Sequence, residues 1–333
     1  MKKNDKLIVV TGAGGFIGGY LTRFFVMEGF KVRAIDRKPV SKWYQVQPSA
    51  ENLCMDLTRN DECEKATENA FEVYNLAADM GGMGFIENNR VACMRSILIT
   101  ANMLESSYNA GVDRYFFSSS ACVYNQELQK DPNVTALKES DALPALSERG
   151  YGWEKLYAEM FCEEYWAERK LKTFIARFHN VYGPHGTWTG GREKAPAAVC
   201  RKIAEAKFEN LDYIEIWGDG TQTRSYTYID DCILGINKIV HTDELIATPI
   251  NLGSSELVSV NTLVNLVEYI AKLEQPLRKI YQLDKPKGVA GRNSDNTFIE
   301  ETLGWSPSTT LLDGLIKTYA WVEEQYLISK GIK

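Results

Sequence analysis

A glycine-rich turn near the start of the chain constrains the fold more than any other stretch. Residues 7–10 form a short apolar run, and Gly12, Gly15 and Gly18 follow it before an amphipathic segment that continues to about residue 28. A strand, a glycine turn and a helix in this order form the context that a dinucleotide-binding fingerprint requires. Gly12 would make the turn, Gly15 would let the backbone approach a pyrophosphate, and Gly18 would let the helix pack close to the strand.

A second strand is predicted at residues 31–35, and it ends at Asp36. An acid about 20 residues after the glycine turn bonds the adenosine ribose in such folds, where a 2′-phosphate would be repelled. Asp36 therefore favours NAD over NADP, while Arg37 beside it leaves NADP open.

Further strands are predicted at residues 52–55 and 72–76. Asp56, at the end of the first, could accept a hydrogen bond from the adenine amine or could be a solvated loop acid. Ala77 and Ala78, at the end of the second, would let the backbone lie against a cofactor. The residues expected to contact NAD are Gly12, Gly15, Phe16, Ile17, Gly18, Asp36, Arg37, Asp56, Leu57, Ala77, Ala78, Tyr151 and Lys155.

Alternation of these strands with helical stretches predicts an α/β fold, a Rossmann-type doubly wound parallel sheet with a smaller α/β substrate-binding domain. We expect residues 1–180 to form the NAD-binding domain and residues 181–333 to form most of the substrate-binding domain, with the chain crossing between the two more than once. Ligands should lie at the carboxyl ends of the strands.

Tyr151 and Lys155 lie four residues apart, and on a helix they would share one face. A neighbouring ammonium lowers the pKa of a phenol toward the range where a phenolate acts as a base. Such spacing is common by chance, so the pair also has a purely structural reading. A predicted strand at residues 114–117 closes in Ser118, Ser119 and Ser120, and a hydroxyl there could face the phenol and orient a substrate oxygen.

The glycine turn, Ser120 and the Tyr151/Lys155 pair resemble, in order and spacing, the extended short-chain dehydrogenase/reductase superfamily. The resemblance spans nearly the whole chain. It implies that Ser120, Tyr151 and Lys155 form an oxidoreductive triad, and that residues 177–184 lead into a nucleotide-sugar pocket.

Two stretches discriminate within this superfamily. A dehydratase would carry an Asp-Glu pair where this chain has Ala121 and Cys122, and a simple 4-epimerase would have threonine at the cysteine. Cys122 suggests proton abstraction at carbon, although it could be a small apolar filler. Residues 79–84, 120–124, 190–198 and 217–225 together resemble the GDP-mannose 3,5-epimerase family, whereas a GDP-fucose synthase would have histidine in place of Lys194.

This resemblance implies inversion of GDP-mannose at C3 and C5, to GDP-L-galactose, GDP-L-gulose or both, through a transient ketone at C4 and tightly bound NAD. Cys122 and Lys194 would act on opposite faces of the ring. A thiolate base and a neutral-range ammonium acid both need shifted pKa values, which Arg192 and Arg224 could assist. The implied substrate contacts are Gly81, Ser120, Ala121, Cys122, Asn180, Glu193, Lys194, Ala195, Lys202, Gln222, Thr223, Arg224, Ser225, Tyr228 and Arg292.

Three alternatives stay open. The chain could be an epimerase-reductase of the fucose-synthase type, which consumes NADPH, or another nucleotide-sugar epimerase. It could also be a nucleotide-sensing binding protein, which would have little reason to keep Ser120, Tyr151 and Lys155 together.

The charge and composition of the chain limit the kinds of partner that it can bind. The formal net charge of -6 gives no broad basic surface, so we expect no nucleic-acid partner. No stretch is apolar for the roughly 18 residues that a membrane span needs, and we expect a cytoplasmic protein without a membrane anchor. The 7 cysteines lack CxxC pairing and the 3 histidines are scattered, so we expect mostly reduced, buried thiols and no metal site. By resemblance, residues 94–109 and the helix of Tyr151 would form a homodimer interface.

Overall fold

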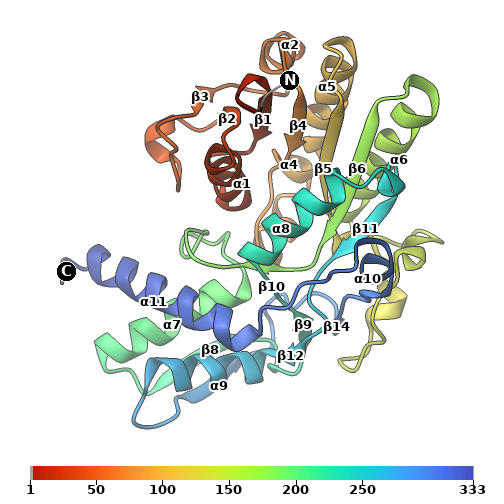
Figure 1. Ribbon diagram of the computed structural model, residues 1–333. Helices are drawn as coiled ribbons and strands as arrows, with labels where there is room; N and C mark the ends of the chain where they lie inside the picture. Colours follow the sequence, from red (N-terminus) through yellow and green to blue (C-terminus); the bar gives the residue numbers. More distant parts are fainter. Residues whose placement is uncertain (1–2, 333) are drawn as a thin grey trace.

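A seven-stranded parallel sheet forms the centre of the larger part of the molecule (Figure 1), in a computed structural model that describes residues 3–332. The strand order is β11-β6-β5-β4-β1-β2-β3, and every neighbouring pair runs parallel. The order reverses between β1 and β4, which is the switch point where open α/β sheets bind ligands. The strands are β1 (Leu7–Thr11), β2 (Lys31–Asp36), β3 (Glu51–Cys54), β4 (Glu72–Asn75), β5 (Arg114–Ser120), β6 (Lys172–Phe178) and β11 (Pro249–Leu252).

Side chains of these strands alternate between two buried layers. Ile8 and Val10 of β1 face one hydrophobic cluster, and Val9 between them faces the other. Because both faces are covered, the strands read as nearly continuous apolar runs. Each such side chain contributes about 1.5–3 kcal/mol through burial.

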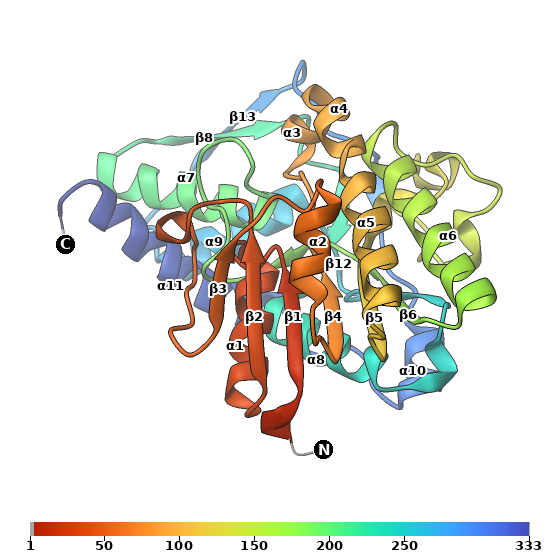
Figure 2. The ribbon, with the colours of Figure 1, turned by 90° about the horizontal axis from the view of Figure 1, so that it is seen from above.

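Helices cover the sheet on both sides (Figure 2). One face carries α1 (Phe16–Met27) and α8 (Ile229–Val240), and the other carries α2 (Asn60–Thr67), α5 (Ser96–Asn109) and α6 (Tyr151–Arg169). The short helices of this part are α3 (Met83–Asn88), α4 (Arg90–Met94), η1 (Lys3–Asp5), η2 (Val40–Lys42), η3 (Ala121–Val123), η4 (Gln126–Gln129), η5 (Glu139–Ala142) and η6 (Asp243–Leu245).

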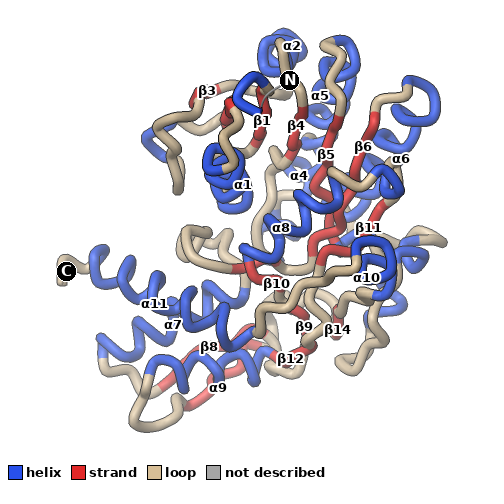
Figure 3. The backbone as a smooth tube through the Cα atoms, in the orientation of Figure 1, coloured by secondary structure: helices blue, strands red, loops and turns tan. Residues whose placement is uncertain are grey.

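A smaller α/β part lies beyond the carboxyl ends of the strands (Figure 3). Its helices α7 (Ala195–Glu209), α9 (Val260–Ala271) and α11 (Leu311–Ser329) pack against one another, and α10 (Thr297–Leu303) lies beside β11. Its strands pair as β8 (Tyr213–Trp217) with β13 (Arg278–Gln282), β9 (Thr223–Ser225) with β12 (Leu257–Ser259) and β14 (Gly291–Arg292), and β7 (Val181–Tyr182) with β10 (Thr227–Tyr228).

The predicted fold class and the first five predicted strands are confirmed, with β5 extending through the serines to Ser120. The helix α8 and the strand β11 lie beyond residue 180 and yet belong to the large sheet and its covering layer. The domain boundary near residue 180 stays a prediction. Within residues 3–332, none of the helices combines the length and apolarity that crossing a lipid bilayer would take.

Candidate active site

A cavity of about 490 Å³ opens at the carboxyl ends of the central strands. It brings together all the residues predicted to contact NAD, namely Gly12, Gly15, Phe16, Ile17, Gly18, Asp36, Arg37, Asp56, Leu57, Ala77, Ala78, Tyr151 and Lys155. Ser120, Gly81 and Lys194, predicted for the substrate, line the same cavity. One site therefore unites the cofactor set with part of the catalytic set.

The glycine turn is shaped for close approach of a ligand. Gly12 has a φ of 68°, and a Cβ atom there would lie 2.9 Å from the backbone oxygen of Leu76. A Cβ atom on Gly18 would lie 2.3 Å from the backbone oxygen of Gly12. Side chains at these positions would strain the turn or force α1 away from β1, so the residues fit a pyrophosphate held at a helix start.

The charged residues at the ends of β2 and β3 differ in how far their side chains are already bonded within the protein. Asp36 accepts a hydrogen bond from the backbone N–H of Lys38 at 2.9 Å and lines the cavity. Arg37 pairs with Asp79 at 2.8 Å, so its guanidinium already has an anionic partner. The carboxylate of Asp56 accepts hydrogen bonds from Thr58, which hold its pKa below the ordinary value.

The predicted triad assembles where β5 meets α6. Tyr151 is the first residue of α6, and the ammonium of Lys155 lies 5.7 Å from the centroid of the Tyr151 ring. Lys155 also lies 4.6 Å from the centroid of Phe117 and 3.9 Å from a carboxylate oxygen of Glu154, and it is buried. Ser120 ends β5, and its hydroxyl accepts a hydrogen bond from the backbone N–H of Cys122.

The expectation of a lowered pKa for Tyr151 is wrong for the protein alone. Burial raises the pKa of the phenol well above its ordinary value, and the charges of Cys122 and Glu154 add to this. A hydrogen bond from Ser120 acts in the opposite direction. The physical reason is that desolvation disfavours the charged phenolate, and the hydrogen bond with Ser120 does not offset this effect.

Cys122 is the middle residue of η3, the short helix that follows Ser120, and it is buried. The Nη1 atom of Arg292 donates a hydrogen bond to its sulfur at 3.2 Å. Burial raises the pKa of the Cys122 thiol, the charge of Glu148 adds to this, and Arg292 lowers it. A cation is thus placed to stabilise the thiolate that the predicted role needs.

Lys194 stands at the N-cap of α7 and lines the 490 Å³ cavity. Burial lowers its pKa and Arg292 lowers it further, whereas Cys122 and Cys232 raise it. The direction agrees with a proton donor near neutral pH. Of the two arginines expected to assist, Arg224 interacts electrostatically with Cys122, while Arg192 lies over the ring of Phe85 at 3.8 Å.

The buried Arg292 and the partly buried Arg224 stand side by side on neighbouring strands, because Arg224 of β9 pairs in register with Arg292 of β14. Burial and the charge of Arg292 lower the pKa of Arg224 to about 10. Several polar atoms around this pair are buried and lack hydrogen-bond partners among the described residues, including Gln222 Oε1, Ser225 Oγ and Arg292 Nη2. Such atoms are costly unless a ligand satisfies them, so this region is suited to an anionic, polar ligand.

The other predicted substrate residues fall into two groups. Gly81 lines the 490 Å³ cavity, and the others lie next to site residues in the chain or bond to a neighbouring strand: Ala121 beside Cys122, Glu193 and Ala195 beside Lys194, Thr223 beside Arg224, and Asn180 through its hydrogen bond to the backbone oxygen of Ser225. Lys202 instead donates to the backbone oxygen of Glu215 at 2.7 Å, and Tyr228 packs against Tyr182 with its ring centroid 5.7 Å away. Tyr228 is not among the residues that line the 490 Å³ cavity, so its substrate contact stays a prediction.

Two residues missed in the sequence surround Arg292. Its Nε atom donates to Gln129 Oε1 at 2.6 Å, and its Nη2 atom lies 3.8 Å from Glu148 Oε2. Neither Gln129 nor Glu148 belongs to a motif. The only local signal is that Glu148 stands three residues before Tyr151.

Most of the cysteines, and His179 among the histidines, are buried in the protein interior. All seven cysteines are free, and all but Cys54 are buried, so the prediction of mostly buried thiols is confirmed. His179 is fully buried and shares a hydrogen bond with Asn251. Across residues 3–332, no group of three or more His, Cys, Asp or Glu side chains is arranged to hold a metal ion.

Known sequences match along most of the chain. The model of the NAD dependent epimerase/dehydratase family matches residues 8–253. GDP-mannose 3,5-epimerase 1 of Oryza sativa subsp. indica is 45% identical over 97% of this chain and 83% of its own length. GDP-L-fucose synthase of Sinorhizobium fredii is 27% identical over 95% of both chains.

Solved structures share the fold. UDP-glucuronic acid 4-epimerase from Bacillus cereus, solved in complex with UDP-glucuronic acid and NAD, has a TM-score of 0.81 and 26% identity, over 96% of this chain and 100% of that chain. The family match, the 45% identity and the cavity lined by the predicted NAD contacts lead to one conclusion. The chain belongs to the NAD-dependent epimerase/dehydratase family, and within it to the group of the GDP-mannose 3,5-epimerases.

Proposed function

We propose that this protein inverts C3 and C5 of the hexose of GDP-mannose, giving GDP-L-galactose, GDP-L-gulose or both. The observation that carries the proposal is the clustering of Cys122 and Lys194, two further proton-transfer groups, around the Ser120, Tyr151 and Lys155 set. A simple oxidation needs only that set, so the extra thiol and amine point to chemistry at carbon.

The reaction needs a temporary carbonyl. Carbons 3 and 5 hold their hydrogens too tightly for a side-chain base, but a ketone at C4 makes both neighbouring C–H bonds acidic because the carbanion becomes an enolate. NAD, when bound in the 490 Å³ cavity, supplies the reversible hydride exchange with C4, and its positively charged ring favours the phenolate form of Tyr151. Gly12, Gly15, Gly18 and Asp36 would hold it.

The chain's own residues move the protons. Tyr151 exchanges a proton with the 4-hydroxyl, Ser120 orients that oxygen, and the buried ammonium of Lys155 stabilises the phenolate. Cys122 removes a proton from carbon as a thiolate beside Arg292, and Lys194 delivers one to the opposite face of the ring. Cys122 is buried, which limits the access of water that would quench the enolate at random.

The arginine pair would hold the diphosphate. Arg224 and Arg292 present two guanidinium groups on adjacent strands, and guanidinium binds phosphate oxygens in a fork. The unpartnered Gln222 and Ser225 atoms nearby would bond the rest of the nucleotide sugar.

An epimerase-reductase of the fucose-synthase type is the nearest rival. It would consume NADPH, yet Asp36 lines the cavity where the 2′-phosphate would lie, and Arg37 is already paired with Asp79. The lower identity to the fucose synthase and the lysine at position 194 also favour the epimerase.

A homodimer is supported by apolar side chains on the outer faces of neighbouring helices. Met94 and Leu98, at the end of α4 and on α5, are exposed, as are Trp153, Tyr157 and Met160 on α6. The helices α5 and α6, which carry most of these exposed residues, pack side by side (Figure 2). Exposed apolar clusters of this kind mark interaction sites.

The test of the proposed reaction is incubation with GDP-mannose in deuterated water, without added cofactor. Deuterium should enter C3 and C5 of the hexose, read by NMR and mass spectrometry. Exchange at neither carbon would overturn the proposal. Turnover of a 4-keto nucleotide sugar that consumes added NADPH, with no reaction of GDP-mannose itself, would support the epimerase-reductase instead.

A further inference from the structure

Glu148 is held beside Cys122 by the backbone. Its N–H group donates to the backbone oxygen of Cys122 at 3.1 Å. Gly152 lets the start of α6 close over both residues, since a Cβ atom there would lie 2.2 Å from the Cys122 oxygen and 3.0 Å from the Cβ atom of Glu148. The position of Glu148 therefore does not depend on its carboxylate.

The carboxylate itself is buried and only partly satisfied. Its Oε2 atom lies 3.8 Å from Nη2 of Arg292, while its Oε1 atom is buried without a hydrogen-bond partner among residues 3–332. Its charge acts on the thiol of Cys122, as does that of Arg292. Arg292 carries only donors, whereas a carboxylate can take up a proton.

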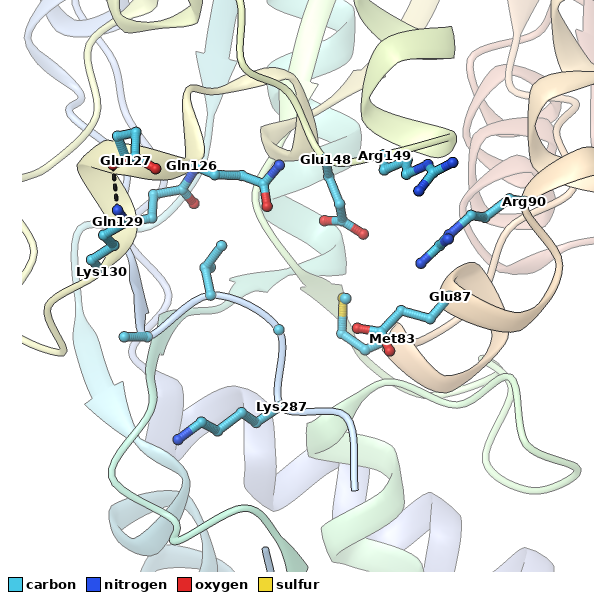
Figure 4. Close-up of a pocket in the computed structure, with 13 residues that line it drawn as sticks. Met83, Glu87, Arg90, Gln126, Glu127, Gln129, Lys130, Glu148, Arg149 and Lys287 are labelled. Carbon is cyan, nitrogen blue, oxygen red and sulfur yellow. Dashed lines mark hydrogen bonds and ion pairs between the residues drawn. The ribbon is translucent and has the colours of Figure 1, made fainter. Parts of the chain in front are cut away.

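A second cavity, of about 650 Å³, lies next to this carboxylate. Figure 4 shows the Glu148 side chain pointing into it, opposite residues of α3 and of segment 287–290. Cys122 is buried and is not one of the residues that line this cavity. Glu148 thus both lines the cavity and interacts with the thiol of Cys122.

The position of Glu148 matters for the proposed reaction because the proton-transfer groups must be restored after each turnover. Each inversion leaves Cys122 with one more proton and Lys194 with one fewer, so both groups must be reset before the next inversion of the same kind. Lys194 lines the 490 Å³ cavity and can exchange its proton there. Cys122 needs a carrier.

Resting on the proposed function, we propose that Glu148 resets Cys122 by carrying its proton to solvent in the 650 Å³ cavity. The S–H bond breaks and leaves its electron pair on sulfur, beside Arg292, while an O–H bond forms on the carboxylate of Glu148. The carboxylic acid then gives the same proton to water in the cavity. No electrons leave the protein, and Glu148 acts through Cys122 as a positioning and relay residue.

Glu148→Gln tests the relay because it keeps the shape and loses the proton acceptor. If the reset takes place in the free enzyme, kcat should fall roughly tenfold or more while kcat/KM stays close to the wild-type value. Glu87→Gln is the matched control, because Glu87 lines the same cavity without being placed in the site, and it should leave both constants unchanged. An unchanged kcat in Glu148→Gln would overturn the inference.

Glu148→Ala with added formate separates the relay from a structural role. The 650 Å³ cavity admits small carboxylates, so formate should restore kcat in proportion to its concentration, and sodium chloride at equal ionic strength should not. A joint fall of kcat and kcat/KM without rescue would mark a structural role and overturn the relay. Absence of deuterium exchange in the wild-type protein would instead overturn the proposed function itself.

Discussion

The guanidinium of Arg292 donates a hydrogen bond to the sulfur of Cys122 at 3.2 Å, across 170 positions of sequence. The contact joins the short strand β14 of the smaller part to the end of β5 in the large sheet. It lowers the pKa of a thiol that burial and Glu148 both raise. The reactivity of Cys122 therefore depends on how the two parts of the molecule meet.

Arg292→Gln should move the acidic limb of the pH–rate profile of kcat/KM to higher pH. Arg292 lowers the pKa of Cys122, so its removal leaves less thiolate at a given pH. A hydrogen bond to a charged group contributes about 1.5–3 kcal/mol, so kcat/KM at pH 7 should fall by roughly 10- to 100-fold. Arg278→Gln, on the edge of the smaller part, is the control, and an acidic limb that stays in place would contradict the assignment.

Lys194→Arg should stop inversion although it keeps the positive charge. Arginine cannot release a proton in this pH range, whereas burial and Arg292 lower the pKa of Lys194. Proton transfer by a positioned group contributes roughly 10²–10⁴-fold, and a loss of this size is expected in deuterium incorporation at the inverted carbons. Calorimetry should show GDP-mannose still binding. Exchange at the wild-type rate would exclude Lys194 as the acid.

Arg177→Met should destabilise the fold. The Arg177 side chain is buried, pairs with Glu159 at 2.8 Å and donates to the backbone oxygen of Glu139 at 2.6 Å, which ties β6 to α6 and η5. Removing one member of a buried pair leaves an unpaired carboxylate and costs about 3–5 kcal/mol. Urea unfolding would measure this, with exposed Arg59→Met expected to behave like the wild type.

The stability of the protein should decrease as the pH is lowered, because of His179. Burial lowers its pKa from 6.5 to about 3, so the unfolded chain binds this proton at a pH where the native protein does not. The contribution of His179 to the free energy of unfolding is fully present above pH 6.5. It is lost as the pH falls toward 3, by up to about 1.4 kcal/mol per pH unit. In urea titrations between pH 7 and pH 4, His179→Gln should show a flatter dependence than the wild type. Parallel curves would contradict the buried neutral imidazole.

Light scattering at micromolar concentration should give the mass of a dimer. Tyr157→Glu places a charge among the exposed apolar residues of α6 and should shift the mass toward that of one chain. Tyr269→Glu, at an exposed position on α9, should leave the mass unchanged. A wild-type protein that runs as a monomer would refute the homodimer.

Local sequence patterns were enough for the sheet and the cofactor cavity. The strands β1 to β5 follow apolar runs whose burial on both faces leaves a clear signature, and the glycine turn fixes where β1 ends. The strand β5 extends further than the apolar run, because Ser118, Ser119 and Ser120 still pair with Ala176, Arg177 and Phe178 of β6. Polar residues at a strand end look like a loop until the partner strand is known.

Electrostatic environments could not be predicted in the same way. The spacing of Tyr151 and Lys155 gives the attraction between two groups on one helix, but the desolvation that raises the pKa of Tyr151 comes from everything packed around α6. Likewise, Glu148 and Gln129 can be recognised as site residues only once β14 is seen to place Arg292 next to both of them. Contacts across such sequence distances follow from topology, which no local spacing encodes.

The helix α6 turns Tyr151, Lys155 and Glu159 inward and leaves Trp153, Tyr157 and Met160 on its outer side. A helix moves as a rigid rod, so a small roll imposed from outside would swing the phenol and the ammonium together. In the proposed dimer, separating the two copies along α6 should therefore slow turnover before either copy unfolds.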